Sequence, residues 1–297
     1  MMSERIYGRI LKGIGGFYYV EAEQTVYECK ARGLFRKNGA VPAAGDMVYF
    51  SLTGETTGNI EEICERKNSL IRPLVANVDM LIIVAAAKNP DPNLFLIDKL
   101  TVIARYKNME PVIVFNKIDL VEKCPYTDIY TKAGFKCFEI CADDGRGTEA
   151  LREYMKGKLC VFTGVSGAGK SSILNKLLKE DTMETGALSK KLSRGKHTTR
   201  YTEIFYSAQD NFYIADTPGF SQLETTAYAK IYKEELAELF PEFEEYMYSC
   251  RFQDCSHTKE KECAVIDAVN SGEISKERHN SYVALYEEAK LLKKWEK

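Results

Sequence analysis

The sequence predicts a multidomain fold: an N-terminal all-β barrel, a central α/β sheet domain and a C-terminal α-helical segment. Short strand patterns broken by glycine fill residues 5–63, and apolar runs alternating with helical patterns follow from about residue 80 to 215. After about residue 221 the strand patterns stop and helical patterns surround a group of cysteines. We expect the parts to cover residues 1–68, 69–221 and 222–297.

The chain has 297 residues, of which 45% are hydrophobic and 28% charged, enough for the cores of two or three globular domains. Its longest apolar run, Met80–Ala87, falls far short of the roughly 20 residues that span a bilayer, and its first residues lack a signal-peptide core. We therefore expect a cytoplasmic protein that does not contact membranes. A monomer is only the default assumption.

Cysteine usage points to a reducing compartment. Nine cysteines is an odd number, and most stand alone beside apolar residues, as Cys29, Cys64, Cys137 and Cys160 do. This pattern is typical of reduced thiols and not of a disulfide framework.

The formal net charge of −2 argues against a uniformly basic surface that binds nucleic acid by charge alone. Two local basic patches remain: Lys30, Arg32, Arg36 and Lys37, and then Lys190, Lys191, Arg194, Lys196 and Arg200. Taken alone, each patch is more often just a solvated surface, because Lys and Arg are mostly exposed in any protein.

Five short strands are expected in the first 65 or so residues: Arg5–Leu11, Phe17–Glu21, Val26–Ala31, Asp46–Leu52 and Gly58–Ile63. Such a series predicts a small closed barrel, of which the OB-fold is the commonest type with a nucleic-acid-binding face. An SH3-like barrel, or a barrel that serves only as a spacer, is the alternative. We favour the nucleic-acid-binding OB-fold.

The central region alternates strands with helices. The expected strands are Met80–Ala86, Pro111–Phe115, Cys137–Ile140, Leu159–Thr163, Ile204–Tyr206 and Phe212–Ala215. The expected helices are Asn93–Tyr106, Arg146–Met155 and Lys170–Lys179, with Ala229–Phe240 and Lys276–Lys294 in the C-terminal part. The alternation predicts a mostly parallel, doubly wound sheet.

A full phosphate-loop motif lies directly after an apolar strand and before a helix: Gly164, Val165, Ser166, Gly167, Ala168, Gly169, Lys170 and Ser171, with Ser172 following. Glycines let backbone N–H groups surround phosphate oxygens, and the helix presents its positive end. We expect Lys170 to reach the outer phosphates and Ser171 to coordinate Mg²⁺. A chance glycine turn is improbable in this context.

A second motif follows the strand Pro111–Phe115 and consists of Asn116, Lys117, Ile118 and Asp119. A carboxylate accepts hydrogen bonds from both N1–H and the exocyclic amine of guanine, whereas adenine offers no such pair of donors. We expect the Asn116 amide to bridge to the phosphate loop and the Lys117 stem to cover the base. Together the two motifs predict a site for GTP and GDP.

Asp216-Thr217-Pro218-Gly219 again follows a strand directly. Asp216 is placed to hold Mg²⁺ through water, and the Gly219 N–H to sense the γ-phosphate. Between this motif and the phosphate loop, either Thr198 or Thr199 is a candidate to close over the metal, and the sequence does not distinguish them. Alone, this basic segment would count as an ordinary polar loop.

The order of the motifs is unusual, because the guanine motif precedes the phosphate loop, whereas ordinary GTPases have it last. The sequence thus predicts a circularly permuted P-loop GTPase domain, whose site still assembles because the termini of compact domains often lie close together. Cys141-Ala142 stands where GTPases usually have a Ser-Ala pair that supports the base.

Three cysteines and one histidine lie within 14 residues near the C-terminus: Cys250, Cys255, His257 and Cys263. Three thiolates and one imidazole complete a tetrahedral Zn²⁺ site without an open position for catalysis. We expect one structural Zn²⁺, which substitutes for a hydrophobic core in a small helical domain. A coincidental group of free thiols is the alternative, since the spacing is not the paired Cys-x₂-Cys type.

With this motif order, the preceding barrel and the following cluster, the sequence closely resembles the RsgA (YjeQ) family of circularly permuted GTPases that depend on the small ribosomal subunit. The resemblance covers nearly the whole chain. It implies an OB-fold, a GTPase domain and a zinc domain that act in late maturation of the 30S subunit, with rRNA as the partner. The chain departs from the family in Lys196, which replaces an arginine, and in Cys141, which replaces a serine.

Catalysis is the least specified step. Many GTPases have a glutamine after Asp-x-x-Gly to orient the attacking water, but this chain has Phe220, so unassisted hydrolysis should be slow. His197 is the nearest ionisable candidate for that role, and the family resemblance indicates the same residue. A contact between His197 and rRNA phosphate is the rival interpretation.

Two other functions compete with a GTPase that the ribosomal particle stimulates. The second interpretation is an RNA-binding adaptor that uses GTP as a lock, with incidental hydrolysis. An ATP-dependent kinase is disfavoured by the guanine motif.

Overall fold

The computed structural model describes residues 5–31, 41–71, 74–178, 202–216 and 230–292. The chain divides into two compact units, one with residues 1–81, 149–163 and 171–220, and the other with residues 82–148, 164–170 and 221–297. No helix in the described ranges has the length and apolar character needed to cross a membrane. The domain boundaries at residues 68 and 221 stay a prediction.

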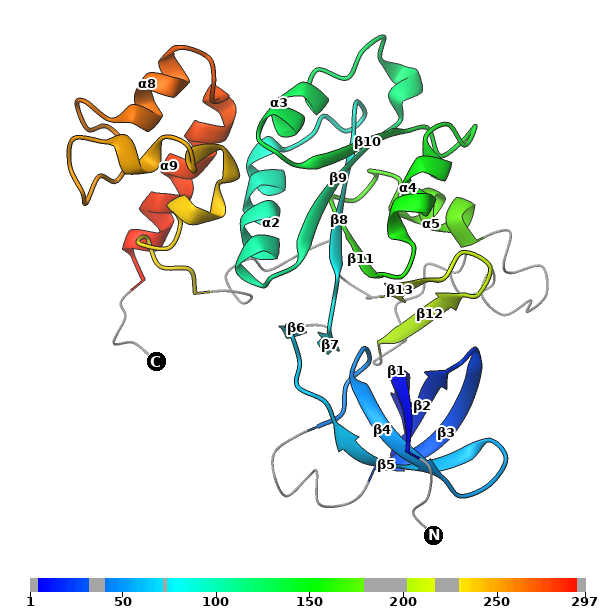
Figure 1. The fold of residues 1–297 in the computed structure, drawn as a ribbon. Coiled ribbons are helices and arrows are strands. Elements are labelled where there is room, and N and C mark those ends of the chain that lie inside the picture. The colour runs from blue at the N-terminus through cyan, green and yellow to red at the C-terminus, as the bar shows by residue number, and fades with distance from the viewer. Residues whose placement is uncertain (1–4, 32–40, 72–73, 179–201, 217–229, 293–297) are drawn as a thin grey trace. The chain divides into compact units, whose positions relative to one another are not determined.

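The first unit begins with a closed five-stranded barrel, coloured blue in Figure 1. Its strands are β1 (Ile6–Ile14), β2 (Phe17–Ala22), β3 (Thr25–Ala31), β4 (Met47–Leu52) and β5 (Thr57–Ile63), in the order β1-β2-β3-β5-β4. β1 pairs with β4 to close the barrel, and β3 with β5 is its parallel pair. The predicted barrel of OB type is confirmed.

Apolar side chains from alternate strand positions fill the interior of the barrel. Side chains at every second position point inward, where Ile10, Val20, Cys29, Phe50 and Ile60 form a core with almost no solvent exposure. A short ribbon, β6 (Ser69–Ile71) with β7 (Leu74–Ala76), follows the barrel and was not predicted. Its strands of three residues are too short to show a period in the sequence.

The predicted, mostly parallel sheet is also confirmed. Its six strands are β8 (Met80–Ala86), β9 (Glu110–Asn116), β10 (Lys136–Ile140), β11 (Leu159–Thr163), β12 (Glu203–Ser207) and β13 (Phe212–Asp216), in the order β10-β9-β8-β11-β13-β12. β9 with β10 and β11 with β13 are parallel pairs, and β12 runs antiparallel to β13 at the edge. β8 and β11 are buried along their whole length, as strands covered on both faces must be.

In the described part of the chain, four α-helices lie between the strands of the sheet: α2 (Leu94–Tyr106), α3 (Thr127–Lys132), α4 (Thr148–Met155) and α5 (Lys170–Leu178). α2 starts as predicted, because the Asn93 side chain caps it by accepting from the Leu96 N–H at 3.1 Å. The prediction that α4 starts at Arg146 was wrong by two residues. The Arg146 N–H is held in a turn by Asp144 Oδ1, at 2.9 Å.

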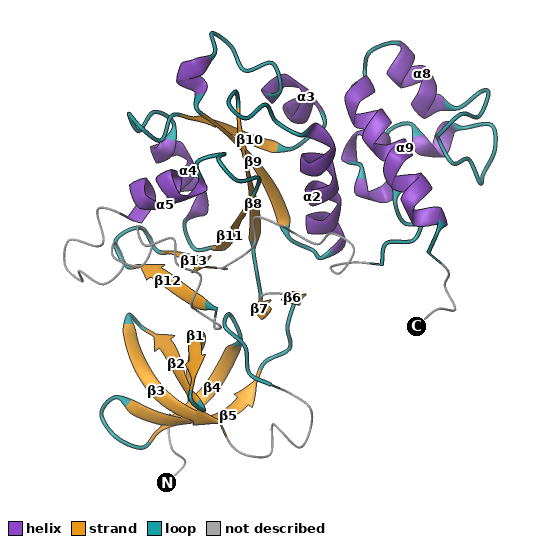
Figure 2. Ribbon diagram, turned by 180° about the vertical axis from the view of Figure 1, so that it is seen from behind, coloured by secondary structure: helices purple, strands orange, loops and turns teal. Residues whose placement is uncertain are grey.

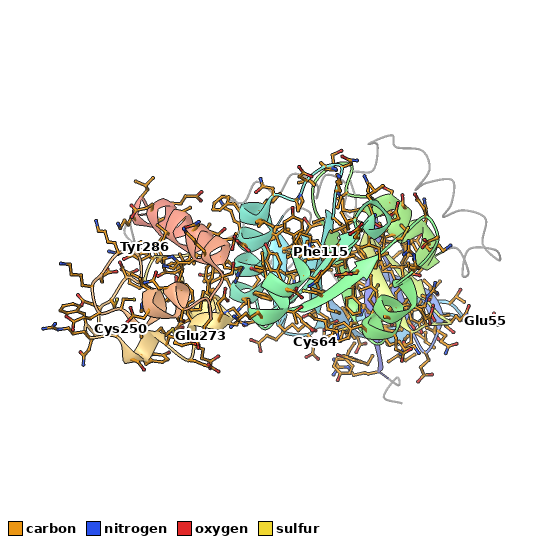
Figure 3. All side chains as sticks on the ribbon, turned by 90° about the horizontal axis from the view of Figure 1, so that it is seen from above. Glu55, Cys64, Phe115, Cys250, Glu273 and Tyr286 are labelled. Carbon is orange, nitrogen blue, oxygen red and sulfur yellow. The ribbon has the colours of Figure 1, made fainter. Side chains whose placement is uncertain are left out.

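The described C-terminal residues contain helices and loops but no strand, as Figure 2 shows. They form η2 (Ala237–Leu239), η3 (Pro241–Phe243), η4 (Met247–Ser249), α8 (Ala264–Asn270) and α9 (Lys276–Lys290). Figure 3 shows Cys250, Glu273 and Tyr286 in this part of the molecule, which we call the helical subdomain, residues 230–292.

Two predictions for the helical subdomain were wrong. Residues 230–240 form turns and a short 3₁₀ helix instead of an α-helix, because Pro241 forces Phe240 into an extended conformation and Leu236 and Phe240 are drawn into the local core. α9 ends at Lys290 and not at Lys294, since Leu291 and Leu292 close the helix with bonds to Glu288 and Ala289. Residues 293 and 294 lie outside the described ranges.

Arg278 of α9 fixes the helical subdomain to α2 within the second unit. Its side chain is 1% exposed; Nη1 lies 2.7 Å from Asp98 Oδ1 on α2, and Nε lies 2.6 Å from Glu242 Oε1. Its guanidinium also lies over the rings of Phe240 and Phe135, at 4.7 and 5.0 Å. Burial raises the pKa of Asp98, and Arg278 opposes this effect by stabilising the charged carboxylate.

We expect Arg278→Met to lower the free energy of unfolding by about 3–5 kcal/mol, because it leaves the buried carboxylates of Asp98 and Glu242 without their cation. Chemical denaturation followed by circular dichroism measures the change.

The matched control is Lys290→Ala on the same helix, which removes an exposed ion pair with Glu287. It should change stability by less than about 1 kcal/mol. Equal stability of Arg278→Met and Lys290→Ala would contradict the role assigned to Arg278.

Candidate functional site

The phosphate loop, residues 164–170, leads from β11 into α5. Gly164 has φ +137°, and a Cβ there would lie 2.0 Å from the Val84 carbonyl oxygen on β8. Only glycine fits this close approach between the loop and the strand. The contact with β8 therefore requires the glycine with which the phosphate-loop motif begins.

Lys170 folds over the loop that precedes it. Its Nζ donates to the Gly164 and Val165 carbonyl oxygens at 2.7 and 3.1 Å. Burial lowers the pKa of Lys170. A buried ammonium among carbonyl dipoles gains from an anionic partner, and phosphate oxygens supply one with more charge than a carbonyl.

Asn116, at the end of β9, joins three loops. Its side chain is 2% exposed; Nδ2 donates to the Ala168 carbonyl oxygen at 2.9 Å, and Oδ1 accepts from the Ala142 N–H at 3.1 Å. The predicted bridge from Asn116 to the phosphate loop is present. A Cβ on Gly169, which has φ +91°, would lie 2.1 Å from Nδ2, so the bridge also requires glycine at 169.

The rest of the guanine motif, residues 117–119, forms a turn. Lys117 adopts a left-handed conformation with φ +62°, its Nζ donates to the Asn89 carbonyl oxygen, and Asp119 is exposed in the 3₁₀ helix Ile118–Leu120. Cys141 is buried beside this turn. Burial raises the pKa of its thiol, and the Asp119 and Asp144 carboxylates act in the same direction, so the thiol keeps the proton that a serine hydroxyl would offer.

The predicted magnesium ligands come from the starts and ends of elements. Ser171, with its neighbour Ser172, is exposed in the first turn of α5. Ile118, which belongs to the guanine motif and not to the magnesium ligands, is half-buried. Asp216 ends β13, which runs parallel to β11 with Ala215 opposite Val161, so both strands end at the same edge of the sheet. His197, Thr198, Thr199, Gly219, Lys196 and Phe220 lie outside the described residues.

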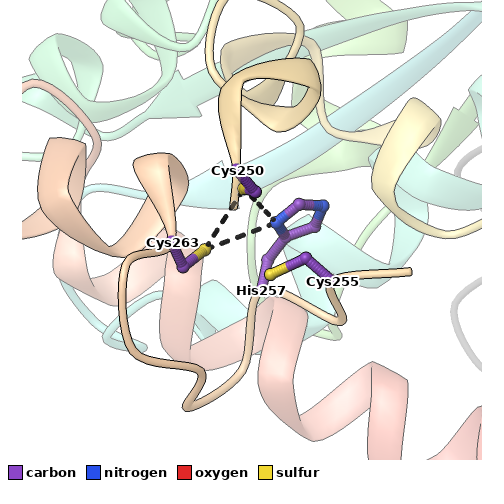
Figure 4. Close-up of side chains that lie close together, drawn as sticks. All are labelled: Cys250, Cys255, His257 and Cys263. Atoms are coloured by element: carbon purple, nitrogen blue, oxygen red, sulfur yellow. Dashed lines mark hydrogen bonds between the residues drawn. The ribbon is translucent and has the colours of Figure 1, made fainter. Parts of the chain in front are cut away.

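The four residues of the cysteine–histidine cluster, Cys250, Cys255, His257 and Cys263, come together in the helical subdomain (Figure 4). Their ligand atoms all lie within 4.8 Å of one another. Cys250 Sγ lies 3.7 Å from Cys263 Sγ, and both sulfurs lie 3.5 Å from His257 Nδ1. Tetrahedral zinc with Zn–S of about 2.3 Å and Zn–N of about 2.0 Å requires separations of roughly 3.5–3.8 Å.

The surroundings of the cluster fix its loop and favour a cation. Burial raises the pKa of the Cys263 thiol to about 12, so a bound cation is needed to hold it as a thiolate at neutral pH. Tyr282 of α9 donates to the Ser256 carbonyl oxygen at 2.8 Å. Burial opposes the charge of Glu260, but hydrogen bonds from Ser256 and backbone N–H groups outweigh it and lower the pKa of Glu260 to about 2.

The loop that follows β8 belongs to the site but was not predicted from the sequence. Asn89 accepts from Lys117, and Pro90 Cδ would lie 3.6 Å from a Cβ on Gly167. The loop therefore borders both the guanine motif and the phosphate loop. Its position directly after a buried parallel strand was the available signal, because such loops line the ligand-binding edge of a sheet.

A phosphate loop held against a guanine motif that precedes it in the chain defines a circularly permuted P-loop GTPase. The model of the RsgA GTPase family matches residues 63–226, and the model of the RsgA N-terminal domain matches residues 7–60. The chain belongs to the RsgA GTPase family, whose members hydrolyse GTP and bind guanine nucleotides.

Two relatives are named small ribosomal subunit biogenesis GTPase RsgA. The one from Clostridium novyi is 46% identical over 95% of this chain and 96% of its own length. The one from Caldanaerobacter subterraneus subsp. tengcongensis is 45% identical over 97% of each.

Two solved structures have the same fold. YloQ, described as a circularly permuted GTPase, has a TM-score of 0.81 and 33% identity over 97% of this chain and 96% of its own. YjeQ from Thermotoga maritima has the same score and identity over 98% of this chain and all of its own.

We expect Gly169→Ala to weaken GDP binding on the order of 10- to 100-fold. The new Cβ would displace Asn116 and leave a buried hydrogen-bonding group unsatisfied, which costs about 1–3 kcal/mol, and about 1.4 kcal/mol corresponds to a factor of ten. Titration with a fluorescent GDP derivative measures the affinity.

Gly157→Ala is the matched control, because Gly157 also has a positive φ (+72°) but a Cβ there would meet nothing within 4 Å. It should cost about 1 kcal/mol of stability from backbone strain and leave GDP affinity unchanged. Equal GDP affinities of the two variants would show that the Asn116 bridge does not hold the site.

Proposed function

We propose that this protein hydrolyses GTP to GDP and phosphate on the small (30S) ribosomal subunit, which it binds through rRNA during late maturation. The Asn116 bridge between guanine motif and phosphate loop is the observation that carries the proposal. The names of the relatives support the ribosomal part. Ribosomal subunits are a cytoplasmic partner, so we place the protein in the cytoplasm. We take it to be a monomer by default.

We assign the following roles to the residues of the nucleotide site. Asp119 accepts hydrogen bonds from guanine, with Lys117 and Ile118 at the base and Cys141 and Ala142 behind it. The backbone of Gly164, Val165, Ser166, Gly167, Ala168 and Gly169 surrounds the phosphates, together with Lys170 and the first turn of α5, which contains Ser171 and Ser172. The Gly219 N–H senses the γ-phosphate.

Magnesium would be held by Ser171 and Asp216, with Thr198 or Thr199 closing over it. It would supply positive charge to the phosphate oxygens as negative charge develops there.

Since Phe220 cannot orient the attacking water, we assign this task to His197, with contact between His197 and rRNA phosphate as the rival role. In either case we expect hydrolysis to be slow without the ribosomal partner.

The barrel offers side chains suited to RNA. Tyr7 is 50% exposed, its ring lies 5.2 Å from that of Tyr49, and the Arg5 guanidinium lies 5.0 Å from the Tyr49 ring. Exposed aromatic rings and cations stack on unpaired bases. These contacts support rRNA as the ligand of the barrel.

Multiple-turnover GTP hydrolysis tests the proposal. Small ribosomal subunits should raise the rate of the wild-type protein by at least about tenfold, equivalent to about 1.4 kcal/mol of the barrier, and large subunits should not. His197→Ala should lose the stimulated rate if His197 positions the water.

An unchanged slow rate with small subunits would contradict the proposal and leave an RNA-binding adaptor that uses GTP as a lock. Stimulation that survives in His197→Ala would confine His197 to an RNA contact. GTP and ATP competition in the same assay distinguishes a GTPase from an ATP-dependent kinase.

We also propose that the cysteine–histidine cluster holds one structural Zn²⁺. Native mass spectrometry should find one zinc per chain, and chelation should lower the melting temperature by several degrees, because the metal holds together a subdomain with a small core. Cys263→Ser should lose zinc, whereas Cys64→Ser, which changes a free thiol outside the cluster, should keep it. Equal zinc content in both variants would refute a site at the cluster.

A further inference from the structure

The barrel and the hairpin formed by β12 and β13 meet within the first unit through three polar contacts. Lys12 Nζ on β1 lies 2.7 Å from Glu203 Oε1 on β12. The Tyr213 hydroxyl on β13 donates to Glu21 Oε2 on β2 at 2.8 Å, and the Arg9 guanidinium lies 4.7 Å from the Tyr213 ring centroid. Figure 1 shows β12 beside the end of β1. The barrel therefore holds both strands of the hairpin.

These contacts are partly shielded from water. Lys12 is 30% exposed and Glu203 22%, so salt screens their attraction less than that of a fully exposed pair. Burial raises the pKa of Tyr213, and the bond to Glu21 raises it further, so the hydroxyl stays a donor at neutral pH. The Tyr213 ring also stacks on Tyr206 of β12 at 4.7 Å, which ties the two strands together.

The hairpin contains the proposed magnesium ligand Asp216, which ends β13. In the antiparallel register of β12 and β13, Glu203 is paired with Asp216. The side chain that meets the barrel thus belongs to the residue directly opposite the end of β13. A displacement of β12 at Glu203 also displaces the backbone of Asp216, because the hydrogen bonds between β12 and β13 fix their register.

We propose that Lys12 and Glu203 are positioning residues that couple RNA contacts of the barrel to the magnesium-binding end of β13. The proposal rests on the proposed function for the ligand of the barrel. Coupling between two binding sites is reciprocal. The nucleotide therefore changes the affinity of the protein for the small subunit by the same factor by which the subunit changes the preference for GTP over GDP.

The first experiment uses the full-length protein without ribosomes. Amide hydrogen exchange of residues 6–14 is compared between the GDP complex and the complex with a non-hydrolysable GTP analogue. The rates should differ between the two complexes of the wild-type protein, and the difference should shrink in Glu203→Gln. Identical exchange in the two wild-type complexes would overturn the coupling, whatever the ribosome does.

The second experiment measures the affinity for small subunits in both nucleotide states. The ratio of the two affinities should be roughly fivefold or more in the wild-type protein, the lower end of typical coupling. Glu203→Gln should bring the ratio toward one, and the charge exchange Lys12→Glu with Glu203→Lys should restore it. Tyr213→Phe, which keeps the ring but removes the bond to Glu21, should reduce the ratio in part.

The variants separate coupling from a direct RNA contact of Lys12. If Lys12 only touches RNA, Lys12→Ala weakens binding equally in both nucleotide states and Glu203→Gln leaves the ratio unchanged, which overturns the proposal. Lys30→Ala controls for the loss of one positive charge from the barrel. Lys30 lies on β3, where its ammonium is over the ring of Phe17 on β2. Failure of wild-type protein to bind small subunits would instead refute the proposed function, and hydrogen exchange would still decide the coupling.

Discussion

The nucleotide site depends on the two hydrogen bonds of the Asn116 side chain. One bond reaches the phosphate loop at Ala168 and the other reaches Ala142 beside the guanine motif. Because both are buried and satisfied, either partner would be left with an unpaired polar group if the loops moved apart. A short amide thus sets the distance between the base-binding and phosphate-binding parts of the site.

The same constraint explains why a permuted chain works. The Asn116 bonds join loops that follow separate strands, and they require those strands to end at the same edge of the sheet. They do not require a particular order of the strands along the chain. The Asn116 side chain reaches the phosphate loop at Ala168 even though the guanine motif precedes this loop by 48 positions, from 116 to 164.

Ionic contacts attach the two flanking parts. Arg278 links the helical subdomain to α2 through a buried network, whereas Lys12 links the barrel to β12 through a partly exposed pair. The desolvated network tolerates little change, because a broken contact leaves buried charge. The partly exposed pair is cheaper to break and therefore suits a contact that responds to a ligand.

The sequence predicted the features that depend on local pattern. β8 and β11 match their predicted bounds because buried parallel strands are continuous apolar runs, and the phosphate loop, guanine motif and metal cluster are each contained in fewer than 15 residues. α3 and α8, with six and seven residues, are too short for a helical period to be visible.

Other features depend on distant partners and were not predictable. Arg278 meets Asp98 across 180 positions, and Lys12 meets Glu203 across 191. Nothing in the local sequence distinguishes a buried arginine from the exposed ones that are far more common. The failed helix at residues 230–240 has the same origin, because packing of Leu236 and Phe240 overrides helix propensity.

The most direct test of a single assembled guanine-nucleotide site is the base specificity of Asp119→Asn. An amide at this position loses the acceptor pair for guanine and gains a donor suited to the second carbonyl of xanthine. Hydrolysis is measured with GTP and with xanthosine triphosphate, in the presence of small subunits. We expect Asp119→Asn to change the preference from GTP to xanthosine triphosphate. An unchanged preference for GTP would show that the guanine motif does not read the base.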